Sequence, residues 1–507
     1  MKRIVLMVLL AGCFHEQLNA QAVELRGVWM TPRSGNNFWT KEQIARAMDS
    51  VAANNFNVVY FNAWSRGWPL WRSTYFFQEA GYYTDPAAGE RDLLQEAITE
   101  AHRRGLELEA WMEYGFVGWY SGYPLPGFPK GPLFNKHPDW LARSSSGSDQ
   151  FPIDQGTFFW MSHNHPAARM FLITLHQELA GKYDLDGIEL DRIRYPNLDC
   201  GYDSVSIALY KQENNGSEPP ANTADPQWMR WRADKLNSFH AQIYDSIKAI
   251  NKYLIVSNAP SHYGSGSSYP AYQSFLQDWK EWLNAGKLDA AQVQMYADPG
   301  SLSAYIPSAL NGLTSEAKTK VFAGVAIKPG GTAFSASQVV QLITTARNAG
   351  LKGVSIWYYN DLFDLNYFSP LKNQAFPLKA TLPHRKESWR NEGLILDEIK
   401  ATRTLGWKTL PFNSAWEGSV SYVEDSVAGQ SIQYQFSIPG SAYYEVYAYQ
   451  FPLLLTKMTD RAPYLLRTAR GSERITLDQS NASTMGWIKL ADAFLEQGNR
   501  TIVEVSK

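Results

Sequence analysis

Between residues 24 and 359 the sequence alternates eight times between a short β-type run and a stretch with helical spacing. The β-type runs span 24–31, 57–63, 107–113, 187–193, 253–258, 291–296, 321–327 and 353–359. The helical stretches include 41–54, 90–104, 166–182, 226–251, 272–285 and 337–348. This alternation predicts βαβ units with parallel strands, and eight strands predict a (β/α)8 TIM barrel. An open doubly wound sheet is the alternative, but no glycine-rich phosphate turn follows the first run.

The pattern changes after about residue 383. Residues 384–409 are charged and partly helical in pattern, which predicts a connector. From residue 410 onward, short alternating runs at 419–423, 432–438, 443–449, 474–477 and 501–505 are separated by turn residues. This spacing predicts a small all-β sandwich. We therefore expect a barrel at 23–383 and a sandwich at 410–507, the latter either a structural appendage or a module that binds carbohydrate.

The first 22 residues have the features of a signal peptide. A positive start at Lys2 and Arg3 precedes an apolar stretch too short to span a bilayer, and Ala20-Gln21-Ala22 offers a cleavage site. In an alternative interpretation, Leu10-Ala11-Gly12-Cys13 is a lipobox, and Cys13 carries a lipid that anchors the protein to a membrane, such as the outer membrane. Both interpretations predict export, to the periplasm or beyond.

Composition excludes several classes of function. A formal net charge of −2 argues against nucleic-acid binding, which needs a clustered excess of Lys and Arg. Two cysteines exclude a disulfide scaffold and a cysteine-based zinc site. Eighteen tryptophans indicate either large aromatic cores or a surface on which sugar rings stack.

Active sites of such barrels lie where the strands end. In the fourth run Glu189 and Asp191 share a face, and Arg192 and Arg194 are their nearest candidate partners. Alternatively, both carboxylates have a purely structural role in a buried ion-pair network. In the third run Glu113 shares a face with Trp111, whose apolar ring is the kind of surrounding that raises a carboxyl pKa.

Other strand ends carry further candidates. Asp361 follows the eighth run in the register of Ser355, Trp357 and Tyr359, which makes it a second candidate acid or a loop carboxylate. Neutral amides and phenols suit sugar hydroxyls. The predicted substrate-binding residues are Arg66, Trp111, Glu189, Arg192, Arg194, Tyr195, Asn258, Gln294, Tyr296 and Trp357. Trp29 and Trp64 could also stack on sugars, and we expect about two of Trp29, Trp64, Trp111 and Trp357 in the cleft.

Several segments together resemble one known family. They are Arg26-Gly27-Val28-Trp29, Asn57-Val58-Val59-Tyr60, His137-Pro138-Asp139-Trp140, Gln294-Met295-Tyr296 and the long run from Tyr183 to Pro196. From about Glu24 to Asn360 the chain resembles the glycosyl-hydrolase-like 10 family. The resemblance implies a (β/α)8 barrel and glycosidase chemistry on bacterial cell-wall glycan (peptidoglycan), with Asp191 as the family's strand-four aspartate. The chain departs from the family at Glu113, where many members have an Asn-containing strand end. The C-terminal part resembles a golvesin-type β-sandwich.

Glycoside hydrolysis needs one carboxylate at the anomeric carbon and one carboxylic acid at the leaving oxygen. We assign Asp191 as nucleophile or base, Glu113 as first candidate acid and Asp361 as second, with no metal and no cofactor. A polysaccharide-binding protein without turnover is one alternative. Another is a metal-dependent deacetylase or amidohydrolase, which the His163-x-His165 spacing would allow. A serine nucleophile lacks its usual G-x-S-x-G turn.

Overall fold

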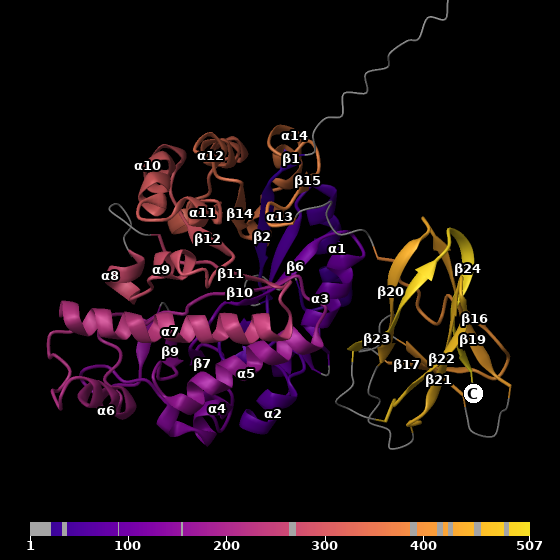
Figure 1. Cartoon of the computed structure of the whole chain (residues 1–507), viewed down its shortest axis with the longest axis horizontal. Coiled ribbons are helices and arrows are strands. Elements are labelled where there is room, and N and C mark those ends of the chain that lie inside the picture. Colours follow the sequence, from indigo (N-terminus) through magenta and orange to yellow (C-terminus); the bar gives the residue numbers. More distant parts are fainter. Residues whose placement is uncertain are drawn as a thin grey trace, which may run out of the picture.

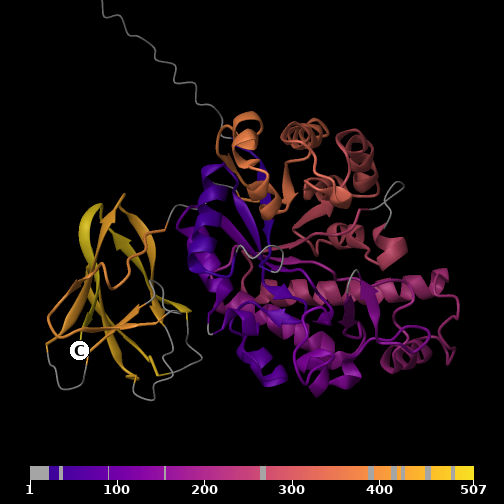
Figure 2. The same ribbon diagram turned by 180° about the vertical axis from the view of Figure 1, so that it is seen from behind.

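The computed structural model describes residues 22–32, 38–89, 91–153, 156–262, 270–385, 393–412, 419–423, 429–450, 458–480 and 486–506. The predicted signal peptide, apart from Ala22, and the candidate lipid site Cys13 lie outside the described residues. The chain forms a barrel domain and a β-sandwich, which lie side by side (Figures 1 and 2).

The eight predicted runs each supply one strand of a closed parallel barrel. The strand order is β10-β11-β12-β13-β14-β2-β3-β6, and all neighbours are parallel. The prediction of a (β/α)8 barrel is confirmed. The strands are β2 (Leu25–Met30), β3 (Val58–Asn62), β6 (Glu107–Met112), β10 (Gly187–Leu190), β11 (Ile255–Asn258), β12 (Ala290–Gln294), β13 (Val321–Ala326) and β14 (Gly353–Trp357).

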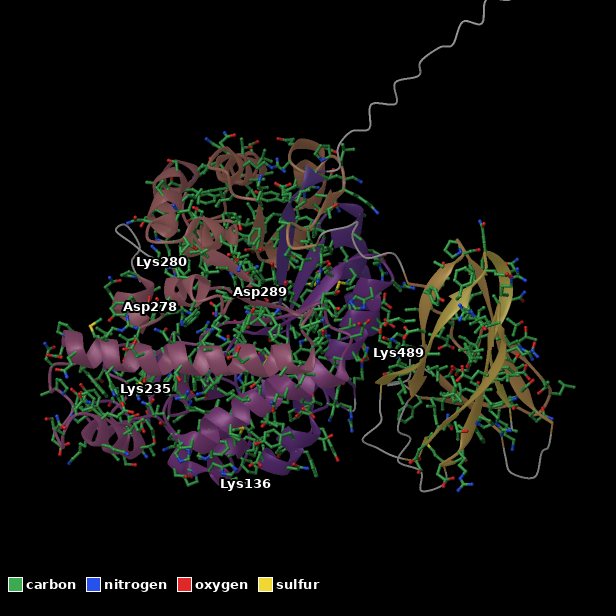
Figure 3. The ribbon with its side chains drawn as sticks, in the orientation of Figure 1. Lys136, Lys235, Asp278, Lys280, Asp289 and Lys489 are labelled. Atoms are coloured by element: carbon green, nitrogen blue, oxygen red, sulfur yellow. The ribbon has the colours of Figure 1, made fainter. Side chains whose placement is uncertain are left out.

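Helices cover the outside of the barrel (Figure 1), and side chains fill the space between them and the strands (Figure 3). The predicted helix at 272–285 is two short helices, α8 and α9. The covering helices are α1 (Lys41–Ala53), α3 (Leu93–His102), α5 (Pro166–Lys182), α7 (Pro226–Ile250), α8 (Ala271–Phe275), α9 (Trp279–Asn284), α10 (Pro299–Leu310), α11 (Ser315–Lys318), α12 (Ala336–Asn348), α13 (Tyr359–Asp364) and α14 (Phe368–Gln374).

Local sequence explains where the helices begin. Thr40 and Gln43 form a capping box at α1, and Ser335 and Gln338 form another at α12. Proline at the first helical position, as in α5 and α7, costs no hydrogen bond because that N–H has no partner within the helix. The predicted C-terminal glycines Gly105 and Gly350 have φ of 74° and 85°, which a residue without a side chain adopts at little cost.

Extra structure, which the sequence pattern did not predict, follows three strands at their carboxyl ends. It includes a hairpin and a helix after β3, a small sheet and a helix after β6, and a helix after β10. These elements are β4 (Trp64–Ser65), β5 (Trp68–Pro69), α2 (Thr74–Ala80), β7 (Val117–Tyr120), α4 (Gly131–Lys136), β8 (Phe151–Ile153), β9 (Gly156–Trp160) and α6 (Ser204–Glu213).

The amino ends of the strands are closed by ion pairs and a short strand pair. β1 (Ala22–Val23) pairs with β15 (Ala380–Thr381). Glu24 forms ion pairs with Arg26 at 2.7 Å and Arg347 at 2.6 Å. Asp289, labelled in Figure 3, accepts from the N–H of Val256 at 2.9 Å just before β12. These contacts hold the end of the barrel opposite to the predicted site.

The C-terminal region is all-β, as predicted. Its buried side chains, among them Ile438, Leu466 and Ile502, form a core separate from that of the barrel. The strands are β16 (Thr402–Arg403), β17 (Lys408–Pro411), β18 (Ser419–Tyr422), β19 (Ser431–Ile438), β20 (Ala442–Gln450), β21 (Ala462–Thr468), β22 (Gly471–Leu477), β23 (Gly486–Leu495) and β24 (Gly498–Ser506). β16, β19, β24, β21 and β22 form one sheet, and β20 pairs with β23.

The expectation of a partly helical connector at 384–409 is wrong for the described residues from 393 onward. They contain no helix, and β16 within them pairs with β19 of the sandwich. Among the helices of the described ranges, none has the length and apolar character to traverse a bilayer. Cys200 is a buried free thiol.

The closure of the barrel between β14 and β2 generates a prediction. At Gly353, where φ is 144°, an added Cβ would lie 2.1 Å from the carbonyl oxygen of Leu25. Gly353→Ala should therefore lower the free energy of unfolding by about 3 kcal/mol, since it combines overpacking with backbone strain. Urea denaturation followed by tryptophan fluorescence measures this loss.

Gly350→Ala is the matched control, because Gly350 also has positive φ but an added Cβ would meet nothing within 4 Å. Its expected loss is about 1 kcal/mol, from strain alone. Equal losses in the two variants would contradict the importance of the close β14–β2 approach.

Candidate active site

A cavity of about 180 Å³ opens at the carboxyl ends of the barrel strands. Its walls come from six of the eight strands or from the residues just after them, as expected for an active site in this fold. The lining residues are Trp29, Trp111, Glu113, Asp191, Arg192, Ala259, Gln294, Tyr296 and Trp357.

Strand register explains why Glu113 and Asp191 meet in this cavity. β6 and β10 are neighbours, and Trp111 lies opposite Glu189 in the register. Because side chains alternate along a strand, the residues two positions further on face the same side. Both carboxyl groups line the cavity, so the structure brings together the predicted nucleophile or base and the first candidate acid.

Asp191 is 4% exposed and accepts two hydrogen bonds. Trp111 Nε1 donates to Oδ2 at 3.3 Å, and the backbone N–H of Arg192 donates to Oδ1 at 2.6 Å. Burial raises the pKa of Asp191 above its ordinary value, whereas the charges of Arg192 and Arg194 and these two donors oppose that rise. The surroundings therefore supply stabilisation for the ionised carboxylate.

Glu113 is 6% exposed, and Asn62 Nδ2 donates to its Oε2 at 2.9 Å. Burial raises the pKa of Glu113 to about 7, and the charge of Asp191 adds to the effect, while Arg192 and Arg66 oppose it. This carboxyl group keeps its proton up to nearly neutral pH, as a general acid requires. Glu113 and Trp111 line the same cavity, but the side chains that act on Glu113 are mostly polar or charged, and it is burial that raises its pKa.

The main chain fixes the turn after Glu113 against the end of β10. Gly115 has φ of 44°, and an added Cβ would lie 2.5 Å from the carbonyl oxygen of Arg192 and 2.6 Å from that of Asp191. Arg192 itself has φ of 50°, a left-handed conformation that is uncommon for a residue with a side chain. The two carboxyl groups are thus carried by backbone segments in direct contact.

Three arginines surround the carboxyl groups. Arg192 and Arg66 pack over the ring of Tyr114, at 4.7 and 5.3 Å from its centroid. Arg194 donates to Ser261 Oγ at 2.8 Å. None of the three forms an ion pair with a carboxylate of the described residues, and the Nε of each lacks a hydrogen-bond partner there. Arg192 therefore brings a positive charge to the cavity wall, while Arg66 and Arg194 lie near the two carboxyl groups without lining the cavity.

Three of the four candidate tryptophans line the cavity, where we expected about two. The ring of Trp357 lies 6.2 Å from that of Trp29 and 5.6 Å from that of Trp111. Trp64 instead is fully buried, donates to the Val117 carbonyl at 3.2 Å and packs against Phe76. Trp29 and Trp111 are each only 1% exposed, whereas Trp357 is partly exposed and is the most accessible of the three indoles.

The predicted amide and phenol also lie in the cavity wall. Gln294 Nε2 donates to the Ala259 carbonyl at 2.8 Å, which orients its side chain. Burial, together with the nearby carboxylates Asp191, Glu189 and Glu113, raises the pKa of Tyr296 well above its ordinary value. Tyr296 therefore stays protonated and can donate a hydrogen bond to a ligand.

Five predicted substrate-binding residues do not line the cavity: Arg66 and Arg194, described above, and the fully buried Glu189, Tyr195 and Asn258. Glu189 is fully buried below the cavity and bonds to Trp29. Tyr195 is fully buried and stacks on His163, at 3.8 Å between ring centroids. Asn258 follows the inward-facing Ser257, so it points out of the barrel, where it is fully buried. In this conformation none of these three buried residues can contact a ligand in the cavity.

The second candidate acid does not line the cavity. Asp361 lies in the first turn of α13 and forms an ion pair with Lys328 at 2.6 Å. Its Oδ1 is engaged by Lys328, and Asp361 is not among the residues that line the cavity. The geometry therefore favours Glu113.

The His163-x-His165 pair does not converge on one point. His163 contacts the Arg194 carbonyl at 3.0 Å, whereas His165 caps the start of α5 and contacts Asp139 at 3.2 Å. Among the described residues, no group of three or more His, Cys, Asp or Glu is arranged to hold a metal ion.

Sequence reasoning missed Asn62, whose amide holds Glu113. The signal was available, because Asn62 ends β3 and lies two residues after the inward-facing Tyr60, so alternation directs it toward the cavity. It also missed Ala259, a small side chain in the wall that carries no chemical signal of its own.

Two family comparisons cover most of the chain. The sequence model of the family described as glycosyl hydrolase-like 10 matches residues 24–336. The model of the Golvesin C-terminal domain matches residues 395–507. The second range includes β16, in agreement with its pairing to β19.

Individual relatives are more distant. Glycosyl hydrolase YngK of Bacillus subtilis (strain 168) is 27% identical over 217 residues, which are 40% of this chain and 39% of the relative. Glycosyl hydrolase DigH of Escherichia coli (strain K12) is 23% identical over 314 residues, 54% of this chain and 65% of the relative. The chain thus spans less than two thirds of the length of either relative.

A solved structure shares the fold. The glycoside hydrolase domain of PgaB (BpsB) from Bordetella bronchiseptica aligns with a TM-score of 0.50 and 13% identity, and the match covers 69% of this chain and 98% of that domain. At this identity the likeness concerns the fold alone. The match to the family model extends over more than half of the sequence, and the chain therefore belongs to the glycosyl hydrolase-like 10 family.

Proposed function

We propose that this protein hydrolyses glycosidic bonds, with Glu113 as general acid and Asp191 as nucleophile or base. One observation carries the proposal: two carboxyl groups from neighbouring strands line one tryptophan-walled cavity, and burial raises the pKa of Glu113 to about 7. Paired carboxyl groups with different proton affinities are what the reaction needs.

Each group has a defined task in this reaction. Glu113 Oε2 accepts the Asn62 amide hydrogen, so its own proton belongs on Oε1, from which it passes to the leaving glycosidic oxygen. As a nucleophile, Asp191 bonds to the anomeric carbon as the glycosidic bond breaks, and water, deprotonated by Glu113, then releases the sugar. As a base, Asp191 instead takes a proton from the water that attacks this carbon. Trp29, Trp111 and Trp357 supply faces that hold the sugar ring over Asp191.

We further propose that the substrate is a bacterial cell-wall glycan and that the protein is exported. The signal-peptide pattern in residues 1–22 and the family resemblance support this view. The positive charge around the cavity is also suited to a glycan that carries carboxylate groups. With Glu113 protonated, Arg66, Arg192 and Arg194 outnumber the single ionised carboxylate, Asp191, among these groups.

Removing either carboxyl group should abolish turnover. Asp191→Asn and Glu113→Gln should each lower kcat by roughly 10³-fold or more, since one loses the stabilising charge and the other the donated proton. The measurement is the release of soluble fragments from peptide-stripped peptidoglycan and other purified glycans, followed by mass spectrometry. Thermal unfolding should stay nearly unchanged for Asp191→Asn.

Asp361→Asn is the control for these variants and should retain activity within a few-fold. If it instead loses as much activity as Glu113→Gln, the acid is Asp361. Saturable glycan binding by the wild type without any new reducing ends would reject hydrolysis in favour of a binding protein.

The activity should depend on pH through Glu113. Because the acid must be protonated, kcat/KM should fall about tenfold per pH unit above the pKa of about 7.

The Glu113 carboxyl group should also make the stability of the protein depend on pH. Its pKa in the folded protein lies above the unfolded value of 4.5, so its contribution to stability is fully present below pH 4.5 and is lost as the pH rises through 7. Glu113→Gln should therefore be more stable than the wild type above pH 7, by an amount on the order of 3 kcal/mol.

Both measurements can contradict the assignment. A pH–rate profile that stays flat to pH 9, or a Glu113→Gln variant whose stability relative to the wild type does not change between pH 4 and pH 8, would be inconsistent with a protonated Glu113.

Arg66 should favour acidic glycans. Arg66→Gln should raise KM about tenfold for a carboxylate-bearing glycan, because a charge-assisted contact is lost, and should leave KM for the carboxyl-reduced glycan unchanged. Kinetics at pH 6 keep Glu113 protonated in all variants. Arg46→Gln, the same change on the outer helix α1, is the control. Equal KM values of the wild type for the two glycans would refute charge recognition but leave hydrolysis intact.

A further inference from the structure

Two glutamates lie inside the barrel directly below the cavity. Glu109 on β6 and Glu189 on β10 are both 0% exposed. Neither forms an ion pair with a cation of the described residues. A buried carboxylate without a counter-ion is costly, so these two groups need another explanation.

Their hydrogen bonds are to neutral donors. Trp29 Nε1 donates to Glu189 Oε2 at 2.6 Å, and Ser257 Oγ donates to Glu109 Oε2. The second oxygen of each carboxyl group, Oε1, has no hydrogen-bond partner in the described part of the chain. Burial raises the pKa of Glu109 to about 8, and burial and the charge of Glu109 raise the pKa of Glu189 well above its ordinary range. Both groups therefore carry a proton at neutral pH.

Register places Glu109 underneath Glu189. Gly187 lies opposite Glu109, and a Cβ at Gly187 would come within 2.9 Å of the Glu109 carboxyl carbon. The Glu109 side chain thus occupies the space that a side chain at 187 would take, one inward position below Glu189 on β10. The lack of a side chain at Gly187 makes this arrangement sterically feasible.

Glu189 does not line the cavity itself but is hydrogen-bonded to Trp29, which does. The indole of Trp29 lines the cavity, and its N–H is bound by Glu189 from below. Asp191, one residue beyond the end of β10, accepts from the N–H of Trp111, which is the neighbouring part of the wall. Glu189 and Asp191 thus each bind the N–H of one tryptophan, but of the two only Asp191 lines the cavity.

We propose that Glu189 is a positioning residue, which fixes the Trp29 indole as a sugar-binding face through its hydrogen bond to Nε1. This inference rests on the proposed glycosidase function of the cavity. Glu189 is then not a second catalytic carboxylate, although it lies two residues from Asp191 in the same motif. Its role requires a hydrogen-bond acceptor and no charge.

The test compares variants that keep or remove the acceptor. Glu189→Gln retains an acceptor oxygen for Trp29, whereas Glu189→Leu and Glu189→Met remove it and fill similar space. Glu189→Gln should keep kcat and KM within about threefold, and the apolar variants should raise KM about tenfold as the indole loses its orientation. Two apolar variants are used so that the test remains possible if one of them does not fold.

A double-mutant cycle tests whether Glu189 acts through Trp29. Trp29→Phe removes the N–H, so Glu189→Leu combined with Trp29→Phe should be no worse than Trp29→Phe alone. Additive losses would overturn the proposal, because Glu189 would then act by another route. A hundredfold loss of kcat in Glu189→Gln would overturn it as well, because it would indicate a catalytic charge.

A measurement independent of activity separates this inference from the proposed function. The indole N–H resonance of Trp29 in ¹⁵N-tryptophan-labelled protein is assigned by its loss in Trp29→Phe. It should stay near its wild-type position in Glu189→Gln and shift in Glu189→Leu. If it does not shift in Glu189→Leu, positioning is wrong whatever the activity. If the resonance shifts as expected but the wild type cleaves no glycan, the proposed hydrolase function is wrong and the positioning role of Glu189 stands.

Discussion

The site depends on how a closed parallel barrel accommodates the carboxyl groups that strand alternation turns inward. β6 and β10 contribute Glu109 and Glu189 to the interior and carry Glu113 and Asp191 at its exit. The lower two have neutral donors and no cation of the described residues, so burial keeps them protonated. The upper two lie among arginines, which oppose the effect of burial. Depth along the barrel axis thus separates the fully buried carboxyl groups from the two that line the cavity.

Much of the fold could be predicted, because hydrophobic periodicity reports directly on strands and helices. Every predicted β-type run before residue 360 became a barrel strand, and α5 has the predicted bounds. The small sheet of β7, β8 and β9 could not be foreseen, because its strands have only three to five residues and are too short to show a clear alternation. The local pattern of the connector predicted a partly helical segment, yet β16 within it pairs with β19, a contact between distant segments that local pattern does not encode.

Site residues could be predicted only where side chains alternate regularly between the two faces of a strand. The success of this alternation rule varied from strand to strand. The rule located Asp191 and Glu113, each one residue beyond the end of a strand. It failed for Tyr195, because the left-handed backbone at Arg192 ends the alternation. It failed for Asp361, since the chain turns into α13 at Tyr359. Asn258 was misassigned because β11 is buried on both faces, so hydrophobicity does not reveal which side is inward.

The contact at Gly115 has a consequence for how such a protein can diverge. The segments that carry Glu113 and Asp191 meet through main-chain atoms, so the separation of their backbones is set by the close approach at Gly115. In glycosidases the separation of the two carboxyl groups decides whether the configuration at the anomeric carbon is retained or inverted. Under the proposed reaction, a change of stereochemical outcome would therefore require a longer or shorter turn between Glu113 and Phe116.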